Sequence, residues 1–323
     1  MTEADLESHR GDVTGELRAD VTAGLTADQK WLPPKWFYDA DGSELFEKIT
    51  ALPEYYPTRC EREVLAARAA DIAGLTGAHT LVELGSGSSE KTRLLLDALT
   101  GHGTLESFVP LDVSESALAE ASAAIAADYP GLAVRGVVGD FTQHLGLLPG
   151  GRPRLVVFLG GTIGNFLPED RATFLKSVRE VLDEGEWLLL GTDLVKDRET
   201  LERAYDDEAG VTAAFNRNVL RVINTGLGAN FDLDAFEHAS YWDAGHEWVE
   251  MRLRARRALT VQIPGAGLEV RFAEGEHIRT EISAKFRPGG VEAELAAAGF
   301  GLERWWTDSQ QRFGVSLARS VRG

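Results

Sequence analysis

The spacing of apolar positions changes along the chain and divides it into parts with different structure. Between about residues 60 and 195, short apolar runs alternate with longer segments in which apolar residues recur at helical spacing. The apolar runs predict strands at 80–84, 107–111, 133–138, 154–159 and 186–192. The longer segments predict helices at 61–75, 93–99, 116–129 and 168–182. Because strands and helices alternate, we expect right-handed β–α–β crossovers and a parallel sheet of five strands.

The rest of the chain follows other patterns. Residues 1 to about 30 are polar, apart from an amphipathic segment at 17–25, and a short helix capped by Ser43 is predicted at 43–49. Period-two spacing from 236 to 272 predicts an antiparallel segment that is covered on one face. Further helices are predicted at 198–209, 211–222 and 291–298, an extended segment at 275–286, and a terminal hairpin of strands at 302–307 and 313–318.

These patterns predict an α/β fold of two domains. The first, 60–195 with 286–323, contains the parallel strands and the C-terminal antiparallel hairpin. The second, 8–59 with 196–285, is an α+β domain that we expect to bind the substrate as a lid. Open α/β sheets bind ligands at the carboxyl ends of their strands, so we expect the ligand-binding residues at those ends.

A glycine-containing turn follows the first predicted core strand. A dinucleotide-binding loop and a phosphate-binding Walker A loop both require glycine at the position of Glu90. The pattern acidic-x-Gly-x-Gly of methyltransferases fits Glu83, Gly85 and Gly87, while an ordinary tight turn also remains possible. Dinucleotide folds usually lack a terminal hairpin, so the arrangement of strands favours a Rossmann-like class I methyltransferase sheet.

Polar residues end four of the predicted strands. Asp112 is suited to accept from ribose hydroxyls, and Asp140 with Phe141 is suited to hold an adenine ring. Asn165 offers both donors and an acceptor, which suits a zwitterionic amino acid. The alternatives are helix caps or turns for the carboxylates, and a surface turn for Asp193.

Composition narrows the class of partner. Asp and Glu number 51 against 33 Lys and Arg, and the net charge of −18 disfavours nucleic acid and anionic membranes. The single cysteine, Cys60, excludes an intramolecular disulfide. The N-terminus is unlike a signal peptide, and we expect a cytoplasmic monomer that acts on small molecules. The seven histidines lack metal-ligand spacing, so we expect surface positions for them and no metal site.

Several stretches together resemble one family, the histidine Nα-methyltransferases of bacterial ergothioneine biosynthesis. The resemblance runs from about residue 17 to about residue 319. The stretches are 33–39 (PPKWFYD), 52–59 (LPEYYPTR), 83–87 (ELGSG), 89–92 (SEKT), 160–165 (GGTIGN), 215–218 (FNRN), 281–283 (EIS) and 285–286 (KF). The resemblance implies an enzyme that trimethylates L-histidine to hercynine with S-adenosylmethionine and without a metal.

The resemblance also implies roles for individual residues. It assigns S-adenosylmethionine binding to Tyr38, Gly85, Lys91, Asp112, Asp140 and Phe141, with Lys91 pairing with the methionine carboxylate. It assigns histidine binding to Tyr55, Phe46, Asn165, Tyr205, Met251, Glu281 and Ser283. In this assignment, Asn165 and Tyr205 hold the carboxylate, and Glu281 and Ser283 bind the imidazole. The residues expected at the reacting amine are Asn165, Tyr38, Gly160 and Thr162.

Three other functions remain open at this point. The first is Nα-methylation of another free amino acid such as tryptophan, although an indole has only one polar atom for Glu281 and Ser283 to bind. The second is a nicotinamide-dependent oxidoreductase, which Glu90 and the terminal hairpin disfavour. The third is a protein that binds the cofactor without catalysis.

Overall fold

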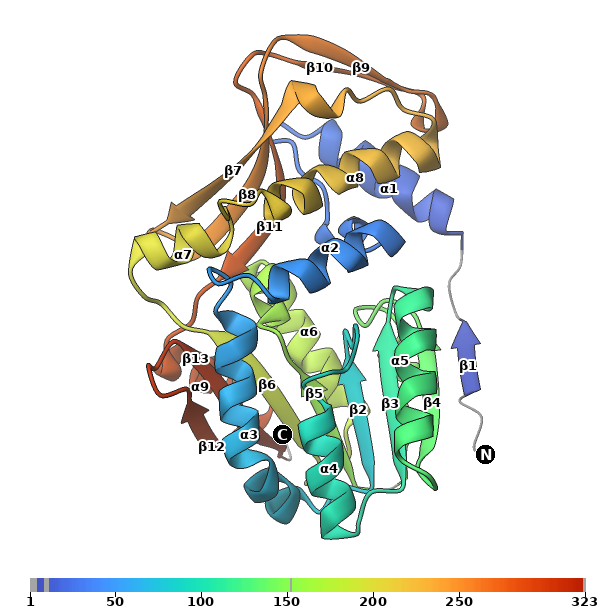
Figure 1. Ribbon diagram of the computed structural model, residues 1–323, viewed down its shortest axis with the longest axis vertical. Helices are drawn as coiled ribbons and strands as arrows, with labels where there is room; N and C mark the ends of the chain where they lie inside the picture. The colour runs from blue at the N-terminus through green and yellow to red at the C-terminus, as the bar shows by residue number, and fades with distance from the viewer. Residues whose placement is uncertain (1–4, 9–11, 152, 322–323) are drawn as a thin grey trace. The chain divides into compact units, whose positions relative to one another are not determined.

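The computed structural model describes residues 5–8, 12–151 and 153–321 of the chain (Figure 1). The chain divides into two compact units. Unit 1 comprises Met1–His9, Pro57–Val195 and Lys285–Gly323, and unit 2 comprises Arg10–Tyr56 and Lys196–Ala284.

Unit 1 contains an eight-stranded sheet in the order β1-β4-β3-β2-β5-β6-β13-β12. Its strands are β1 (Asp5–Ser8), β2 (Thr80–Leu84), β3 (Ser107–Asp112), β4 (Ala133–Val138), β5 (Arg154–Phe158), β6 (Trp187–Asp193), β12 (Phe300–Thr307) and β13 (Phe313–Ser320). Strands β4, β3, β2, β5 and β6 are parallel, whereas β13 pairs antiparallel with both β6 and β12. This confirms the predicted five-stranded parallel core and its terminal hairpin.

Helices cover both faces of the sheet in unit 1. Figure 1 shows α3, α4 and α5 on one face and α6 and α9 on the other. Their bounds are α3 (Pro57–Thr76), α4 (Arg93–His102), α5 (Glu115–Asp128), α6 (Pro168–Val181) and α9 (Pro288–Ala297). Because both faces are covered, β2 and β5 are buried at every residue, which explains why they appear in the sequence as continuous runs.

Strand β1 was not predicted from the sequence. It pairs in parallel with β4, with Asp5 opposite Arg135 and Ser8 opposite Val138. Leu6 is the only apolar residue among its four, so no alternation of apolar and polar positions marks it as a strand.

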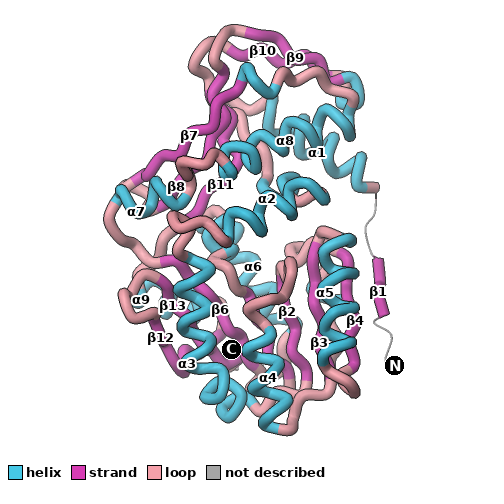
Figure 2. Tube along the Cα trace, viewed as in Figure 1, coloured by secondary structure: helices cyan, strands magenta, loops and turns pink. Residues whose placement is uncertain are grey.

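Unit 2 combines helices with two small antiparallel sheets (Figure 2). Its helices are α1 (Val13–Leu25), α2 (Ala40–Thr50), α7 (Arg198–Ala204) and α8 (Val211–Leu227). Its strands are β7 (Phe236–Asp243), β8 (Trp248–Ala255), β9 (Leu259–Ile263), β10 (Leu268–Phe272) and β11 (His277–Ala284). The order β11-β8-β7 forms one sheet and β10-β9 another, and the strands within 236–272 pair antiparallel, as predicted.

Helix α2 begins earlier than predicted, and Ser43 is not its cap. Asp39 is the cap, because its Oδ1 accepts a hydrogen bond of 2.8 Å from the backbone N–H of Gly42. The N–H of Ser43 already donates to the carbonyl of Asp39 within the first turn. The aspartate at the end of the aromatic stretch therefore sets the start of the helix.

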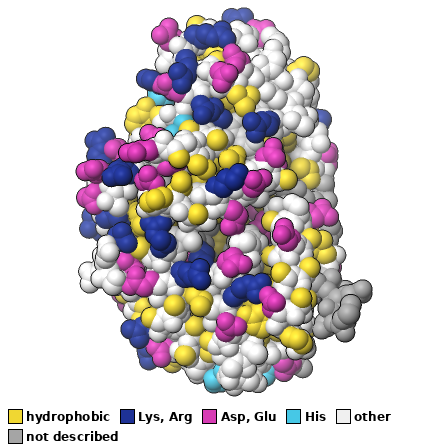
Figure 3. Space-filling view, in the orientation of Figure 1, with side chains coloured by type: hydrophobic (Ala, Val, Ile, Leu, Met, Phe, Trp, Pro, Cys, Tyr) yellow, Lys and Arg dark blue, Asp and Glu magenta, His cyan; other side chains and the backbone are white. Residues whose placement is uncertain are grey.

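Charged side chains of both signs are interspersed over the face of the molecule in Figure 3. The net charge of −18 is therefore not collected in a single patch on that face. Among the described residues, every helix is too short or too polar to cross a membrane.

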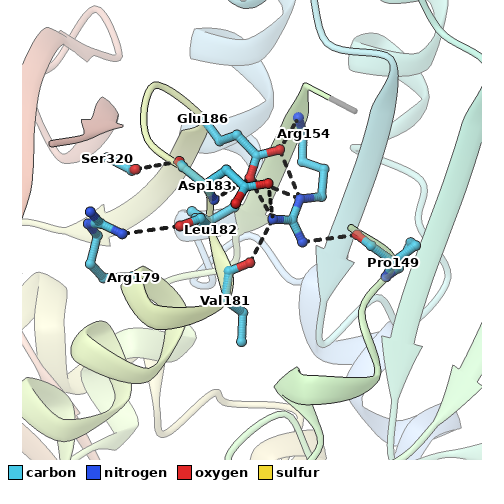
Figure 4. A network of polar contacts seen from close by, with 8 residues as sticks. All are labelled: Pro149, Arg154, Arg179, Val181, Leu182, Asp183, Glu186 and Ser320. Carbon is cyan, nitrogen blue, oxygen red and sulfur yellow. Dashed lines mark hydrogen bonds and ion pairs between the residues drawn. The ribbon is translucent and has the colours of Figure 1, made fainter. Parts of the chain in front are cut away.

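A buried ion pair fixes the start of β5 to the start of β6 (Figure 4). The guanidinium of Arg154 donates to both carboxylate oxygens of Glu186, at 2.5 and 2.9 Å, and also to the carbonyls of Pro149 and Val181. Arg154 and Glu186 are 3% and 5% exposed. Glu186 additionally accepts from the backbone N–H of Asp183 at 2.7 Å, so each of its oxygens is paired.

We predict that Arg154→Ala lowers the free energy of unfolding by about 3 to 5 kcal/mol, because the buried Glu186 carboxylate loses its counter-charge and keeps only backbone N–H donors. Arg68→Ala is the control, since Arg68 forms an exposed ion pair with Asp71 and should change the free energy by at most about 1 kcal/mol. Denaturant unfolding of both variants measures this. Equal small losses would contradict a stabilising role for the buried pair.

Candidate functional site

The glycine loop after β2 has a backbone that favours glycine. Gly85 and Gly87 adopt φ values of 69° and 50°, in the left-handed region. A Cβ atom at Gly85 would lie 3.4 Å from the ring of Phe141, so a side chain there would press on that ring. Ser89 also has a positive φ, 54°, which costs a residue with a side chain about 1 kcal/mol. Ser89 occupies the position where related loops often carry a further glycine.

Glu83 stabilises this loop by accepting hydrogen bonds from two of its hydroxyl groups. It is 4% exposed, and its carboxylate accepts a hydrogen bond of 2.7 Å from Ser89 Oγ and another from Thr92 Oγ. Burial raises the pKa of Glu83 to about 7. The acidic residue of the predicted motif thus binds the hydroxyls of its own loop and holds Ser89 in its uncommon conformation.

We predict that the Glu83 carboxylate makes stability depend on pH. Its pKa is raised from 4.5 to about 7 in the native protein, so the native state binds more protons than the unfolded chain between these values. The free energy of unfolding therefore falls as the pH rises through this window. Between about pH 5 and about pH 8, we expect the wild type to lose on the order of 2 to 3 kcal/mol more than Glu83→Gln. Denaturant unfolding at both pH values measures the difference, and identical pH profiles would refute the shift.

The two predicted carboxylates lie at the ends of adjacent strands. Asp112 Oδ2 accepts from the N–H of Gly87 at 2.9 Å, and its Oδ1 accepts from the N–H of Ser114 at 2.8 Å. Asp112 thus ties the glycine loop to the start of α5. Asp140 accepts from the N–H and the hydroxyl of Thr142, at 2.8 and 2.6 Å.

Phe141 presents a half-buried ring beside the loop. Its ring lies 5.1 Å from Phe158 and 5.8 Å from Phe174, measured between centroids, so buried aromatic residues support it from behind. The structure therefore brings together Gly85, Asp112, Asp140 and Phe141 at the carboxyl ends of β2, β3 and β4. Two carboxylates suit the hydroxyls of a ribose and the amino group of an adenine, whereas they would repel the negative charges of a pyrophosphate.

Lys91 and Gly160 share a partner that the sequence analysis missed. The carboxylate of Glu61, on α3, is fully buried and binds the ammonium of Lys91. Both of its oxygens lie 2.9 Å from the backbone N–H of Gly160, which donates to them. Glu61 stands on the same helical face as the apolar Val64 and Leu65, and a charge among apolar positions is the signal that marks it.

The turn after β5 carries three predicted residues. Gly160 and Gly161 both have positive φ, and residues Thr162–Asn165 form a short 3₁₀ helix, η3. Thr162 Oγ donates to the carbonyl of Leu159 at 3.1 Å, and Asn165 is half-buried at the end of η3. Glycines at this turn let ligand atoms approach the backbone closely.

Asp193 does not lie in a surface turn. Its carboxylate is 2.9 Å from Lys285 Nζ, and both side chains are buried, at 4% and 0% exposure. The Lys-Phe dipeptide at 285–286 therefore provides a structural partner for the end of β6.

In unit 2, aromatic rings connect most of the predicted histidine-binding residues. Tyr38 lies 5.6 Å from Phe46, Phe46 lies 6.3 Å from Tyr55, and Tyr55 lies 6.2 Å from Tyr205, measured between ring centroids. The Tyr205 hydroxyl is hydrogen-bonded to Ser283 Oγ at 2.7 Å. Five residues from separate segments thus form one continuous group.

Met251 and Glu281 lie opposite each other on neighbouring strands, β8 and β11. Met251 is 2% exposed, whereas Glu281 is half-buried. Glu281 and Ser283 are two residues apart on β11, so their side chains project from the same face of that strand. A carboxylate, a hydroxyl and aromatic rings in one group can hold a ligand with both polar and flat parts.

His238 is not a surface residue, contrary to the expectation for the histidines. Its side chain is 2% exposed and bonds to the carbonyl of Tyr205 at 2.7 Å and to Asn216 at 2.8 Å. Burial lowers the pKa of His238, which keeps the imidazole neutral. Period-two spacing placed residue 238 in an antiparallel strand but gave no sign that a helix covers it.

The strand order of unit 1 and the polar residues at its strand ends define a class I methyltransferase, for which the methyl donor is S-adenosylmethionine. The family described as "Histidine-specific methyltransferase, SAM-dependent" matches residues 17–320, and the chain belongs to this family. This confirms the family expected from the sequence.

Relatives with assigned activities support this membership. The chain is 59% identical to a histidine N-alpha-methyltransferase of Mycolicibacterium smegmatis, over 94% of each chain. It is 55% identical to a histidine N-alpha-methyltransferase of Mycobacterium tuberculosis, over 97% of this chain and 98% of the relative. An L-tryptophan methyltransferase of Psilocybe serbica is 26% identical over 96% of this chain and 94% of its own.

The residues present fit S-adenosylmethionine. Gly85 is exposed and Asp112 is partly accessible, so the loop and the strand end offer surface to a ligand. Ser86 Oγ, in the same loop, is buried and has no hydrogen-bond partner among the described residues. A buried hydroxyl of this kind is typical of a site where a ligand or water completes the hydrogen bonds.

Proposed function

We propose that the protein catalyses the S-adenosylmethionine-dependent Nα-methylation of L-histidine, and that it adds three methyl groups to yield hercynine. The observation that carries this proposal is the contact of Tyr38, Phe46, Tyr55, Tyr205 and Ser283 in unit 2. The family resemblance assigns most of these residues to one histidine ligand, and their contact in this chain supports that assignment.

Two groups of residues divide the binding roles in this proposal. In unit 1, Gly85, Lys91, Asp112, Asp140 and Phe141 hold the donor, with Asp112 accepting from ribose hydroxyls. Asn165, Gly160 and Thr162, in the turn after β5, contact the amine and carboxylate of histidine. Tyr205 binds the same carboxylate, and Glu281 and Ser283 bind the imidazole nitrogens. Tyr38 contacts both the donor and the reacting amine of histidine. The remaining contacts to the substrate come from Tyr55, Phe46 and Met251.

Positioning supplies most of the catalysis in this proposal. When bound, S-adenosylmethionine provides an electrophilic methyl group on a sulfonium, and transfer requires an in-line approach of a neutral amine. The residues at the amine fix that line of approach by hydrogen bonds. Tyr38, Phe46 and Tyr55 present aromatic faces that attract a quaternary ammonium by cation–π interaction, which suits the trimethylated product.

Glu281 and Ser283 favour histidine over tryptophan. An imidazole offers two nitrogens to a carboxylate and a hydroxyl, whereas an indole offers one N–H and leaves the second group unpaired. A site built for such hydrogen bonds rejects a ligand that lacks them by several kcal/mol, on the order of 10⁴-fold at most. Within this proposal the enzyme is a cytoplasmic monomer that acts on small molecules, and its charge of −18 opposes binding to polyanions.

Mass spectrometry of L-histidine incubated with the protein and S-adenosylmethionine tests the function. We expect mono-, di- and trimethylated histidine to form in succession, and tryptophan in the same mixture to remain unmodified. Thermal shift with S-adenosylhomocysteine but not NAD should accompany this result, because only a bound ligand stabilises the native state. Equal methylation of tryptophan would refute histidine specificity, and stabilisation by NAD alone would favour an oxidoreductase.

A pair of variants should separate the two binding roles. Glu281→Ala should weaken histidine binding by about 10-fold to 100-fold and leave the affinity for S-adenosylhomocysteine within about 2-fold, because only the imidazole loses a charged partner. Asp112→Ala should do the reverse. Calorimetric titration of both variants with both ligands measures this. Unchanged histidine affinity in Glu281→Ala would remove that carboxylate from the imidazole site.

A further inference from the structure

Strand β11 contains a bulge directly before Glu281. The register pairs Arg279 with Arg252 and Glu281 with Met251, so Thr280 is an extra residue without an opposite partner. A bulge re-aims the side chains that follow it, because a shift of one residue moves side chains to the other face of the strand. The directions of Glu281 and Ser283 therefore depend on what keeps this bulge in place.

Asn216 of α8 binds the bulged residue. Thr280 Oγ, itself 1% exposed, donates to Asn216 Oδ1 at 2.7 Å and lies 3.0 Å from the carbonyl of Met251. Asn216 is fully buried, and its amide nitrogen donates to the carbonyl of Arg252 at 3.1 Å. Since that carbonyl can only accept, the amide has one orientation, with nitrogen toward β8 and oxygen toward Thr280.

The same amide nitrogen determines the tautomer of His238. Its second hydrogen points to His238 Nδ1 at 2.8 Å, so Nδ1 accepts and the proton of the neutral ring is on Nε2. Nε2–H then donates to the carbonyl of Tyr205 at 2.7 Å. The hydrogen bonds thus run in one direction, from Thr280 through Asn216 and His238 to the backbone of Tyr205.

We propose that Asn216, His238 and Thr280 are positioning residues that set the specificity of the histidine site. They hold the backbone of Tyr205 and the bulge before Glu281 at fixed positions, while Tyr205 and Ser283 are joined by their own hydrogen bond. The inference rests on the proposed function, because it acts through the residues assigned there to the imidazole and the carboxylate. It also gives a role to the asparagine at 216 in the FNRN stretch.

Asn216→Asp tests the inference with almost no change in volume. The variant keeps an acceptor for Thr280 but places an oxygen against the carbonyl of Arg252 and against His238 Nδ1, so both donated hydrogen bonds are lost. We expect the KM for histidine to rise about 10-fold or more and the KM for S-adenosylmethionine to stay within about 2-fold. The wild-type KM values, measured alongside, provide the reference.

Asn224→Asp is the matched control on the same helix. The half-buried Asn224 side chain bonds to the carbonyl and the N–H of Phe231, at 2.9 and 2.8 Å, so its conversion also removes one hydrogen bond to a backbone carbonyl. A purely structural effect would lower the thermal stability of both variants alike and leave both KM values unchanged. A larger KM for histidine in Asn216→Asp alone supports the inference, and equal KM values in the two variants overturn it.

A second pair of variants keeps the test decisive if Asn216→Asp does not fold. His238→Gln retains a side-chain N–H that can reach the carbonyl of Tyr205, whereas His238→Phe has no donor. We expect His238→Phe to raise the KM for histidine about 10-fold and His238→Gln to recover most of that loss. Equal KM values in the two variants overturn the inference while wild-type methylation of histidine leaves the proposed function intact. A wild type that methylates no histidine overturns the proposed function first.

Discussion

The hydrogen bonds between Glu83 and the hydroxyls of Ser89 and Thr92 are the interaction on which the glycine loop depends. A carboxylate at the end of a fully buried strand is unfavourable unless its oxygens are paired. Here the pairing groups come from the loop that follows the strand, so satisfying Glu83 also shapes the loop. The loop then exposes its backbone to a ligand while its hydroxyls face inward. The hydrogen bonds from Ser89 and Thr92 offset part of the free-energy cost of burying the Glu83 carboxylate.

Other buried polar groups in both units are likewise paired with groups from distant segments. Glu61 in unit 1 is satisfied by Lys91 and the N–H of Gly160, which links two segments that the proposed function assigns to donor and substrate. In unit 2, Asn216 and His238 are hydrogen-bonded to each other, to the hydroxyl of Thr280 and to backbone carbonyls. Breaking any single bond in such a network leaves a buried polar group unpaired, which is why networks of this kind fix conformations more firmly than apolar packing does.

Local patterns were enough to predict the core of unit 1. Strands β2 and β4 begin and end at the predicted residues, because a buried parallel strand is a short apolar run with sharp ends. The carboxylates Asp112 and Asp140 were found for a related reason, since Asp112 directly follows such a run and Asp140 comes two residues after one. Strand β1 was missed because its pairing with β4 requires contact with residues about 130 positions away and leaves no apolar pattern behind.

Buried polar residues were the weakest part of the prediction, for a physical reason. Glu61 and His238 each have a partner far along the chain, 99 positions away for Gly160 and 33 for the carbonyl of Tyr205. A sequence pattern reports whether a position faces the core, but the identity of a hydrogen-bond partner depends on the tertiary fold. Glu61 alone carried a visible signal, a charge on an apolar helical face.

Within the proposed function, specificity for one amino acid depends on a few residues of the site, because a fold alone does not determine the ligand. An aromatic group such as Tyr38, Phe46 and Tyr55 attracts any flat side chain and any methylated amine, and it distinguishes them poorly. Discrimination between amino acids therefore depends on polar groups of the site that lose their hydrogen-bond partner when the wrong ligand binds. A half-buried carboxylate on β11 can discriminate only if its direction is fixed, which makes the bulge before it as important as the carboxylate itself.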